Sequence, residues 1–306
     1  MSESIESDIA FEITTSVVEI HPFTRYNFYK KIPELKMTSH LSVYRLGSTL
    51  IDTGSLPVSE PLLSLLGSQK IDRIILTHQH EDHIGGLPAL LKKFPAVKIF
   101  APEKLVDIIH KGFTVPRYRR AYWGGLQIFD GEIIAYNEDS FFEQDQFLLK
   151  AIALPGHTPY QIGFLVEFKD VMYVLSADLY IAARLPSAWM ETSVPDFIDS
   201  LQTLINLETK TGKKLFILPT HGKILPDGAE KLQVLLSWYR KIQTNVLECS
   251  SRLKTRDYYS IFFELYKEFN HGEFRSKGEL SRLNLIRGVL DPVKNLPATL
   301  LQVPET

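Results

Sequence analysis

Residues 77–86 read THQHEDHIGG, which places three of the chain's nine histidines and two carboxylates within six positions. A buried imidazole ring costs free energy unless something bonds its nitrogens, so a hydrophobic core gains little from such a cluster. Imidazole nitrogens are, however, common ligands of zinc and other transition metals. The cluster therefore predicts that His78, His80 and His83 bind metal and that other parts of the chain supply the missing ligands.

Further candidates for these ligands follow other short apolar runs. Strand ends that share one edge of a sheet are rigid and close together, as a preorganised metal site requires. Because each run leads into a single His or Asp, we expect these residues and the histidine cluster to form one site. The four are Asp52 (STLIDTG), His157 (IALPGHTP), Asp178 (YVLSADL) and His221 (FILPTHG).

Short β-rich runs dominate the first two thirds of the chain, and helical patterns dominate the rest. Val, Ile, Phe and Tyr, interrupted by Gly, Pro and Asp, predict strands over 13–20, 41–46, 48–51, 73–77, 97–100, 147–154, 163–168, 171–176 and 215–219. Amphipathic spacing predicts helices over 61–66, 87–93, 103–110, 197–207, 229–253, 258–269 and 279–290. The pattern indicates a mixed β/α body followed by a helical tail.

The composition narrows the class of protein. At 306 residues and 44% hydrophobic, the chain can bury a large core. Its formal charge of −2 gives no overall basic field, although the part from Lys231 onward carries 12 Lys and Arg against 8 Asp and Glu. The lone Cys249 excludes an intrachain disulfide and a cysteine-rich metal site. The acidic start lacks the pattern of a secretory signal or membrane helix, which favours a cytoplasmic protein without a membrane partner.

The stretch HQHEDH resembles the HxHxDH pattern of the metallo-β-lactamase superfamily. The four strand-end residues named above resemble its other motifs and follow in the same order, over roughly residues 12–225. The resemblance implies an α/β fold, the αββα four-layer sandwich, with two β-sheets face to face, helices outside and the metals at one edge. Residues 1–228 are then expected to form the catalytic domain, and residues 229–306 a helical extension similar to a winged-helix tail.

The same resemblance implies a centre of two divalent metal ions. Zinc is our first choice for imidazole and carboxylate ligands without thiolate, and iron or manganese stays open. Asp52 is expected to support the ligand loops without binding metal itself. The first ion would be held by His78, His80 and His157, and the second by Asp82, His83 and His221, with Asp178 bridging both.

Two such ions would lower the pKa of a shared water, so that a bridging hydroxide can attack a substrate near neutral pH. Asp82 would orient this nucleophile and later pass on its proton. The commonest zinc β-lactamases use a cysteine ligand and lack the bridge that Asp178 implies, so antibiotic hydrolysis is not expected. The bridged set is similar to that of glyoxalase II-type thioesterases, lactonases and nucleases.

The leading hypothesis is a metal-dependent hydrolase of a small ester, thioester or lactone with an acidic group. The alternative is a metal-dependent ribonuclease or phosphodiesterase with the basic tail as an RNA platform, although nucleic acid is not the favoured partner. An iron-dependent oxygenase on the same fold is a third hypothesis, which metal analysis would separate from the others. The tail could also pack on the body or form a homodimer contact.

Two segments are candidates for contacts with the substrate. In residues 111–125, arginines alternate with aromatic residues, which is typical of a lid that holds an anionic substrate or of a solvated loop. Tyr180 and Arg184 closely follow Asp178, and they either line the pocket or serve as packing and surface residues. The lid candidates are Arg117, Tyr118, Arg119, Arg120, Tyr122 and Trp123.

Overall fold

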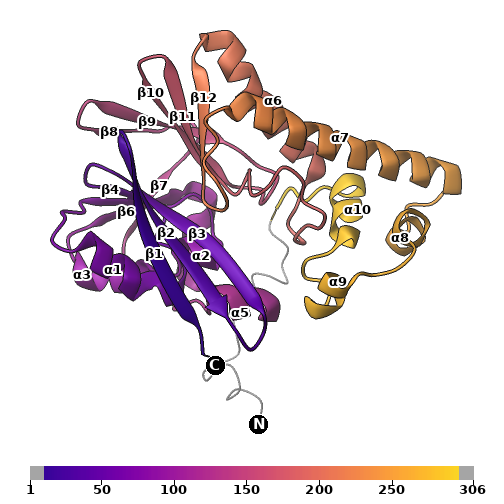
Figure 1. Ribbon diagram of the computed structural model, residues 1–306, viewed down its shortest axis with the longest axis horizontal. Helices are drawn as coiled ribbons and strands as arrows, with labels where there is room; N and C mark the ends of the chain where they lie inside the picture. The colour runs from indigo at the N-terminus through magenta and orange to yellow at the C-terminus, as the bar shows by residue number, and fades with distance from the viewer. Residues whose placement is uncertain (1–9, 296–306) are drawn as a thin grey trace. The chain divides into compact units, whose positions relative to one another are not determined.

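The computed structural model describes residues 10–295 of the chain (Figure 1). The outer ends of the two expected domains, residues 1–9 and 296–306, lie outside the described residues. The described chain forms two compact units, one of residues 10–137 and 143–146 and one of residues 138–142 and 147–295.

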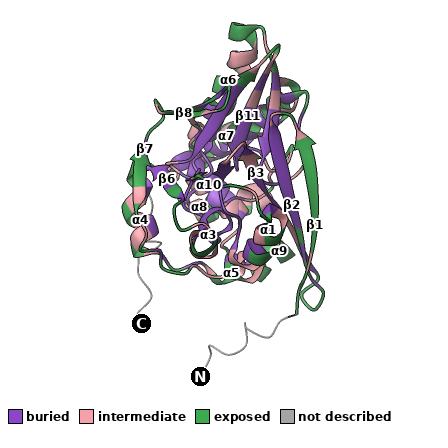
Figure 2. Ribbon diagram, turned by 90° about the vertical axis from the view of Figure 1, so that its left-hand side faces the viewer, coloured by how far each residue is buried: buried purple, intermediate pink, exposed green. Residues whose placement is uncertain are grey.

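A seven-stranded sheet forms the body of the first unit, with its strands in chain order. β1 to β4 pair antiparallel, and β4 to β7 run parallel because helical segments join them. β1 is largely exposed, whereas β2 beside it is buried along most of its length (Figure 2). The strands are β1 (Glu12–Ile20), β2 (Phe23–Ile32), β3 (Met37–Leu46), β4 (Thr49–Ile51), β5 (Arg73–Ile75), β6 (Lys98–Pro102) and β7 (Ile133–Tyr136).

One face of this sheet is apolar. Leu50, Ile74 and Ile99 lie side by side on neighbouring strands, so their side chains point to the same face of the sheet. All three are at most 2% exposed, which shows that this face is buried. The unit's helices are η1 (Leu56–Val58), α1 (Ser59–Leu66), α2 (Glu81–Ile84), α3 (Leu87–Lys93), η2 (Glu103–Leu105), α4 (Val106–Lys111) and α5 (Arg117–Trp123).

The parallel strands bring their C-terminal ends to one edge of the sheet. Ile51 lies beside Ile75 in the register of β4 and β5, and the Asp52 N–H donates to the Ile75 carbonyl at 2.9 Å. The loop after β4 therefore begins next to the loop after β5, which contains the histidine cluster.

The second sheet has the strand order β12-β11-β10-β9-β8. β11 and β12 are parallel, and β10 pairs antiparallel with both of its neighbours. Its strands are β8 (Phe141–Gln144), β9 (Phe147–Ala153), β10 (Ile162–Phe168), β11 (Val171–Ala177) and β12 (Lys214–Pro219). The helices that follow are α6 (Val194–Thr211), α7 (Gly228–Leu253), α8 (Tyr258–Tyr266), α9 (His271–Arg275) and α10 (Arg282–Leu290).

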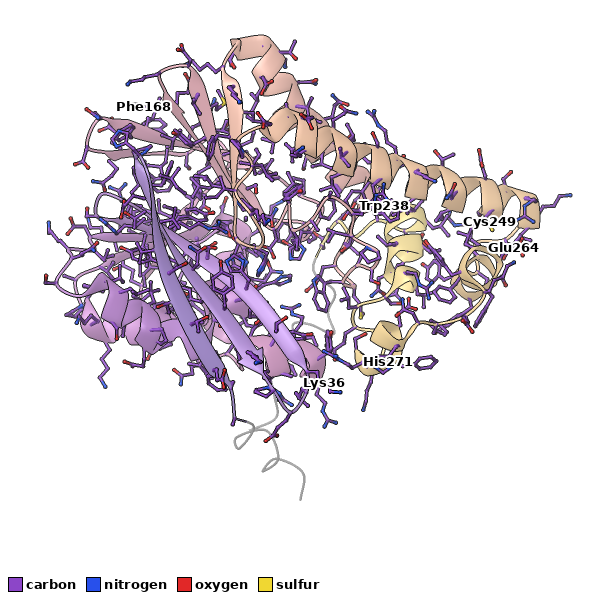
Figure 3. The ribbon with its side chains drawn as sticks, viewed as in Figure 1. Lys36, Phe168, Trp238, Cys249, Glu264 and His271 are labelled. Carbon is purple, nitrogen blue, oxygen red and sulfur yellow. The ribbon has the colours of Figure 1, made fainter. Side chains whose placement is uncertain are left out.

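The C-terminal helices belong to the second compact unit. Phe197 of α6 stacks on Tyr239 of α7 with ring centres 4.6 Å apart, and both rings are buried. Figure 3 labels Trp238 and Cys249 on α7 and Glu264 on α8. The predicted class, α/β with a C-terminal helical region, is confirmed, whereas the domain boundary after residue 228 stays a prediction. In the part of the chain that is described, no helix combines the length and the apolar character needed to cross a bilayer.

Several elements are absent from the sequence-based expectations, namely β2, β7, β8, η1, α2, α5 and α9. β2 reads FTRYNFYKKI, in which polar and charged residues interrupt the apolar ones, so no simple alternation marks it as a strand. The structure buries some of these polar groups together, because Arg25 Nε donates to Ser42 Oγ of β3 at 2.8 Å. Tertiary contacts therefore stabilise a strand that its local pattern does not indicate.

Candidate metal centre

The histidine cluster lies in the loop that leaves β5 and turns into α2. Tyr136 Oη donates to the Leu76 carbonyl at 2.6 Å and holds the start of this loop. His78 and His83 are fully buried and His80 is 3% exposed, so the rings lie inside the fold rather than on its surface.

Asp52 organises this loop from the end of β4. Its Oδ1 accepts the Thr77 backbone N–H at 2.8 Å, and its Oδ2 accepts the Thr77 hydroxyl at 2.9 Å and His83 Nδ1–H at 2.7 Å. An ionised carboxylate only accepts hydrogen bonds, so all three groups must donate to it. Asp52 has a φ of 62°, a left-handed conformation that Asp adopts more readily than most residues.

These bonds fix which nitrogen of each ring carries the proton. The Thr77 hydroxyl donates its hydrogen to Asp52, so its oxygen accepts from His78 Nδ1, which lies 3.0 Å away. His78 and His83 thus both carry the proton on Nδ1, which leaves Nε2 of each ring as the nitrogen that could bind a metal ion. Metal-binding histidines are oriented by hydrogen bonds of this kind to their other ring nitrogen.

The glycines that close THQHEDHIGG allow the loop to pack against the turn after β4. Thr53 donates to the His83 carbonyl from its N–H at 2.8 Å and from its hydroxyl at 2.7 Å. A Cβ atom at Gly86 would come within 2.5 Å of the Thr53 carbonyl oxygen, and one at Gly85 within 2.7 Å of the Leu56 nitrogen. Only glycine permits such an approach of two backbones.

In the second unit, His157 is carried by the loop after β9. Gly156 has a φ of 138°, and a Cβ atom there would lie 2.7 Å from the backbone nitrogen of Phe197. The Gly156 carbonyl accepts the Ser193 N–H at 2.8 Å, which ties the loop to the start of α6. His157 is consequently held at a fixed place, only 3% exposed.

Asp178 follows an irregular end of β11. The pairing with β12 shifts register between Leu175 and Ala177, and Ala177 has a φ of 45°. The Asp178 N–H donates to Gln161 Oε1 at 3.2 Å, and Gln161 Nε2 donates to the Leu154 carbonyl at 3.0 Å. One buried amide therefore joins the end of β9 to the backbone at Asp178, just after β11.

His221 completes the residues that the second unit contributes, just after β12. Asp178 Oδ2 lies 3.4 Å from His157 Nε2 and 3.3 Å from His221 Nε2. Gly222 next to His221 has a φ of 80°, and a Cβ atom there would meet the Ile181 carbonyl oxygen at 2.7 Å. A carboxylate oxygen between two imidazole nitrogens is suited to bridging two cations that those rings bind.

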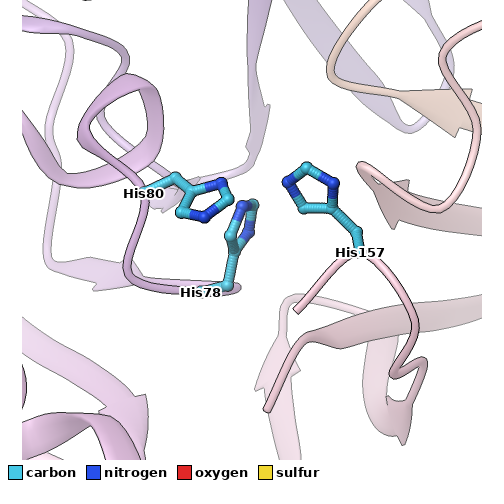
Figure 4. A group of neighbouring side chains, drawn as sticks. All are labelled: His78, His80 and His157. Atoms are coloured by element: carbon cyan, nitrogen blue, oxygen red, sulfur yellow. The ribbon is translucent and has the colours of Figure 1, made fainter. Parts of the chain in front are cut away.

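Within the described residues, two groups of His and Asp side chains could hold a metal ion, and Figure 4 shows the three imidazoles of the first. Nitrogen and carboxylate donors without thiolate fit divalent ions such as zinc, iron or manganese and do not select among them. The assignment of single ligands stays a prediction. The groups are His78, His80 and His157, and Asp82, His83, Asp178 and His221.

Comparison with known proteins identifies the family. The model of the metallo-beta-lactamase superfamily matches residues 43–186, which include Asp52, the histidine cluster, His157 and Asp178. The matched segment, residues 43–186, belongs to the metallo-β-lactamase superfamily. A metallo-beta-lactamase from Pontibacter korlensis aligns with a TM-score of 0.55 at 19% identity, over 74% of this chain and 99% of that one. A metallo-beta-lactamase family protein from Thermus thermophilus aligns with a TM-score of 0.56 at 15% identity, over 92% of both chains. These likenesses show the metallo-β-lactamase fold.

Three curated relatives resemble this chain more closely in sequence. An atrochrysone carboxyl ACP thioesterase of Aspergillus fumigatus is 28% identical, over 67% of this chain and 42% of its own length. A ribonuclease Z of Bacillus subtilis is 28% identical over 45% and 44%, and a hydroxyacylglutathione hydrolase of Hamiltonella defensa is 26% identical over 53% and 54%. The chain thus spans about half the length of the curated relatives it matches. Its superfamily homologues are metal-dependent hydrolases.

The predicted lid of this chain contains the short helix α5. Arg119 is 3% exposed, and its guanidinium pairs with Glu81 of the histidine cluster. Arg117 is exposed, and Tyr122 Oη lies 3.1 Å from Tyr118 Oη on the same helix. The middle of the segment is therefore a helix, and one of its arginines contacts the fold rather than solvent.

Of the two substrate-contact candidates after Asp178, Tyr180 is buried and Arg184 is exposed. Tyr180 is 7% exposed within the apolar core of the second unit, and burial raises the pKa of its hydroxyl. The Arg184 guanidinium lies 5.9 Å from the ring centre of Trp238 on α7. Substrate contacts by Tyr180 and Arg184, like those by Arg117 and Tyr122, stay predictions.

Three residues that hold these loops, Thr77, Gln161 and Arg119, are not assigned that role by the sequence patterns. The Thr77 hydroxyl forms hydrogen bonds with both Asp52 and His78. The position of Thr77 between the strand and the first histidine could have indicated this role from the sequence. Gln161 and Arg119 carry no such signal, because each acts on a loop that is distant in the sequence.

Proposed function

We propose that this chain is a dinuclear metal-dependent hydrolase that acts on a small ester, thioester or lactone. The observation that carries the proposal is the position of Asp178 Oδ2, 3.4 Å from His157 Nε2 and 3.3 Å from His221 Nε2. The first unit supports it, because Asp52 and Thr77 turn the Nε2 atoms of His78 and His83 into ligating positions.

The proposed centre uses seven side chains. When bound, two divalent ions would acidify a water molecule and polarise the substrate carbonyl. Asp82 Oδ2 lies 3.8 Å from His83 Nε2, so its carboxylate lies beside a proposed metal ligand. From there Asp82 would accept the proton of the attacking water and return it to the leaving group. Zinc is the first choice of metal. We assign His78, His80 and His157 to one ion, Asp82, His83 and His221 to the other, and Asp178 to both.

An acyl group is the favoured substrate. Two of the three relatives reported above are a thioesterase and a hydroxyacylglutathione hydrolase by name, and both names describe the release of an acyl group. The exposed Arg117 of α5 would attract an acidic substituent of a small substrate.

A phosphodiester is the alternative substrate, because ribonuclease Z is among the relatives at comparable identity. The same two ions could then assist attack on phosphorus, with the basic residues of the C-terminal helices near the RNA. Single-stranded RNA therefore belongs in the first substrate panel.

The test measures initial rates on a thioester, a lactone and a short single-stranded RNA, with the zinc content of the protein determined in parallel. His80→Ala is the active-site variant, and His271→Ala, at an exposed position at the start of α9 (Figure 3), is the matched control. We expect acyl turnover that His80→Ala loses and His271→Ala keeps. RNA cleavage without acyl turnover would favour the alternative, a metal-dependent phosphodiesterase. A protein that binds no metal would overturn the proposal of a metal-dependent hydrolase.

A further inference from the structure

Arg119 of helix α5 contacts the loop that holds His78, His80 and His83, which we call the histidine loop (residues 77–86). Arg119 Nε donates to Glu81 Oε1 at 2.9 Å, and Arg119 Nη2 bonds Glu81 Oε2. Glu81 is fully buried and Arg119 is 3% exposed. The pair is thus a two-point, charge-assisted contact from which water is largely excluded.

Glu81 stands between two proposed metal ligands in the sequence, His80 and Asp82. It opens the single turn α2, in which the His80 carbonyl accepts the His83 N–H at 2.9 Å and the Glu81 carbonyl accepts the Gly85 N–H at 3.0 Å. A rotation of this turn would therefore move His80, Asp82 and His83 together. A guanidinium that grips the Glu81 carboxylate at two points opposes that rotation.

The helix that carries Arg119 is itself anchored. Lys30 of β2 donates from Nζ to the Tyr122 carbonyl at 2.9 Å and lies 3.4 Å from the Ala121 carbonyl, in the last turn of α5. A cation at this end also interacts favourably with the helix dipole. Arg119 therefore reaches Glu81 from a helix fixed to the sheet.

A gain in folding stability does not by itself explain why two charged side chains are buried together. Desolvation of two buried charges offsets most of their attraction, and apolar residues of similar size often stabilise a protein as well or better. A fork-shaped, two-point contact does supply orientation, which metal ligands need to within about 0.5 Å.

We propose that Arg119 is a positioning residue that acts through Glu81 to hold the histidine loop in its metal-binding geometry. The inference rests on the proposed function in that it takes this loop to bind metal. Arg119 is not expected to touch the substrate, so its loss would weaken metal binding and lower kcat while leaving KM nearly unchanged.

The experiment compares the metal affinity of folded proteins by competition with a zinc chelator, alongside the melting temperature of each metal-free protein. The main variant is the double change Arg119→Met with Glu81→Gln, because it leaves no unpaired buried charge and so avoids the folding failure that Arg119→Met alone risks. Arg119→Lys keeps the positive charge but cannot form two parallel hydrogen bonds with the Glu81 carboxylate. The matched control is Arg252→Met with Glu264→Gln, which removes an Arg–Glu pair of 2.8 Å on the C-terminal helices.

We expect the double variant to bind zinc about 10–100-fold more weakly, as for other groups that orient metal ligands. Its metal-free melting temperature should stay close to that of the unmodified protein. Arg119→Lys should recover part of the affinity, and the control pair should change nothing. Unchanged zinc affinity in the double variant would overturn the positioning role and leave the proposed function standing. No zinc binding by the unmodified protein would overturn both.

Discussion

Asp52 Oδ2 lies 2.7 Å from His83 Nδ1, and this contact joins the end of β4 to the histidine loop after β5. The same carboxylate also accepts two hydrogen bonds from Thr77. Because all three partners are donors, the side chain at this position must be able to accept from each of them. The contact therefore requires a carboxylate rather than merely a polar residue.

Asp52→Asn tests this requirement. The amide has the shape of the carboxylate but presents an NH2 group to at least one of the three donors, which would turn His83 or Thr77 away. We expect zinc affinity to fall about 10–100-fold, measured by chelator competition. Asp72→Asn, at an exposed position just before β5, is the control and should bind zinc normally. Full affinity in Asp52→Asn would show that the hydrogen-bond pattern does not orient the ring.

The backbone at Gly156 sets the position of His157. Gly156→Ala would place a Cβ atom 2.7 Å from the Phe197 nitrogen at a φ of 138°, so the loop has to move. We expect a loss of at least about 1 kcal/mol in the free energy of unfolding, together with weaker metal binding. In the control Gly125→Ala, the Cβ atom has no heavy atom within 4 Å, so stability should be kept. Equal unfolding midpoints for both variants would contradict the argument.

The strands that deliver the candidate ligands could be predicted from the sequence. β4, β5, β9, β11 and β12 agree with the predicted runs to within two residues at each end, because buried strands read as compact apolar stretches that stop at a turn. The proposed ligands follow these strands directly, so chemistry and local pattern indicate the same positions.

Contacts between distant segments could not be predicted in this way. Arg119 was expected to be either a lid residue or a surface residue, yet it is buried against Glu81, which is 38 positions away. Nothing in RYRRAYW distinguishes the arginine that turns inward from the two that stay exposed. The choice is made by the packing of α5, which a single sequence does not reveal.

The C-terminal helices contain a buried polar cluster with a testable pH dependence. Glu273 is 3% exposed and accepts hydrogen bonds from Arg282, Ser281 and the Asn270 N–H. Burial acts to raise the pKa of the Glu273 carboxyl, but these donors hold it below its ordinary value. A carboxyl whose pKa is lower in the folded state stabilises the fold above its unfolded pKa, and the stabilisation is lost as pH falls through the folded pKa.

Glu273→Gln should therefore lower the free energy of unfolding by about 1.5–3 kcal/mol near neutral pH, the usual range for hydrogen bonds to a charged group. The loss should shrink as pH falls below the unfolded pKa and through the lowered folded pKa of Glu273, because the native carboxyl then becomes protonated as well. Urea unfolding at a series of pH values from 7 downward checks both statements, with Glu268→Gln, an exposed neighbour, as the control. A deficit of the same size across the whole series would assign the effect to packing instead of charge.

Lys30 gives a second pH dependence, in the first unit, and here too stability should rise with pH. Its side chain is buried beneath α5, and burial lowers the pKa of its amine from an ordinary value of 10.5 to about 8. Between these two values the unfolded chain binds more protons at this site than the folded chain does. The free energy of unfolding should therefore rise with pH across this window, because the cost of burying the charged amine disappears as it deprotonates.

Lys30→Met removes the titrating group, and Lys31→Met, at the exposed next position, is the control. Urea unfolding from pH 7.5 to pH 10 should show the stability of the unmodified protein rising relative to Lys30→Met. The neutral amine still has N–H groups to donate to the carbonyls of Ala121 and Tyr122, so the anchor of α5 should survive the loss of charge. A constant difference between the two proteins across this range would show that the folded amine titrates like an ordinary lysine. A difference that falls with pH would mean that the positive charge itself, through the dipole of α5, contributes more than its burial costs.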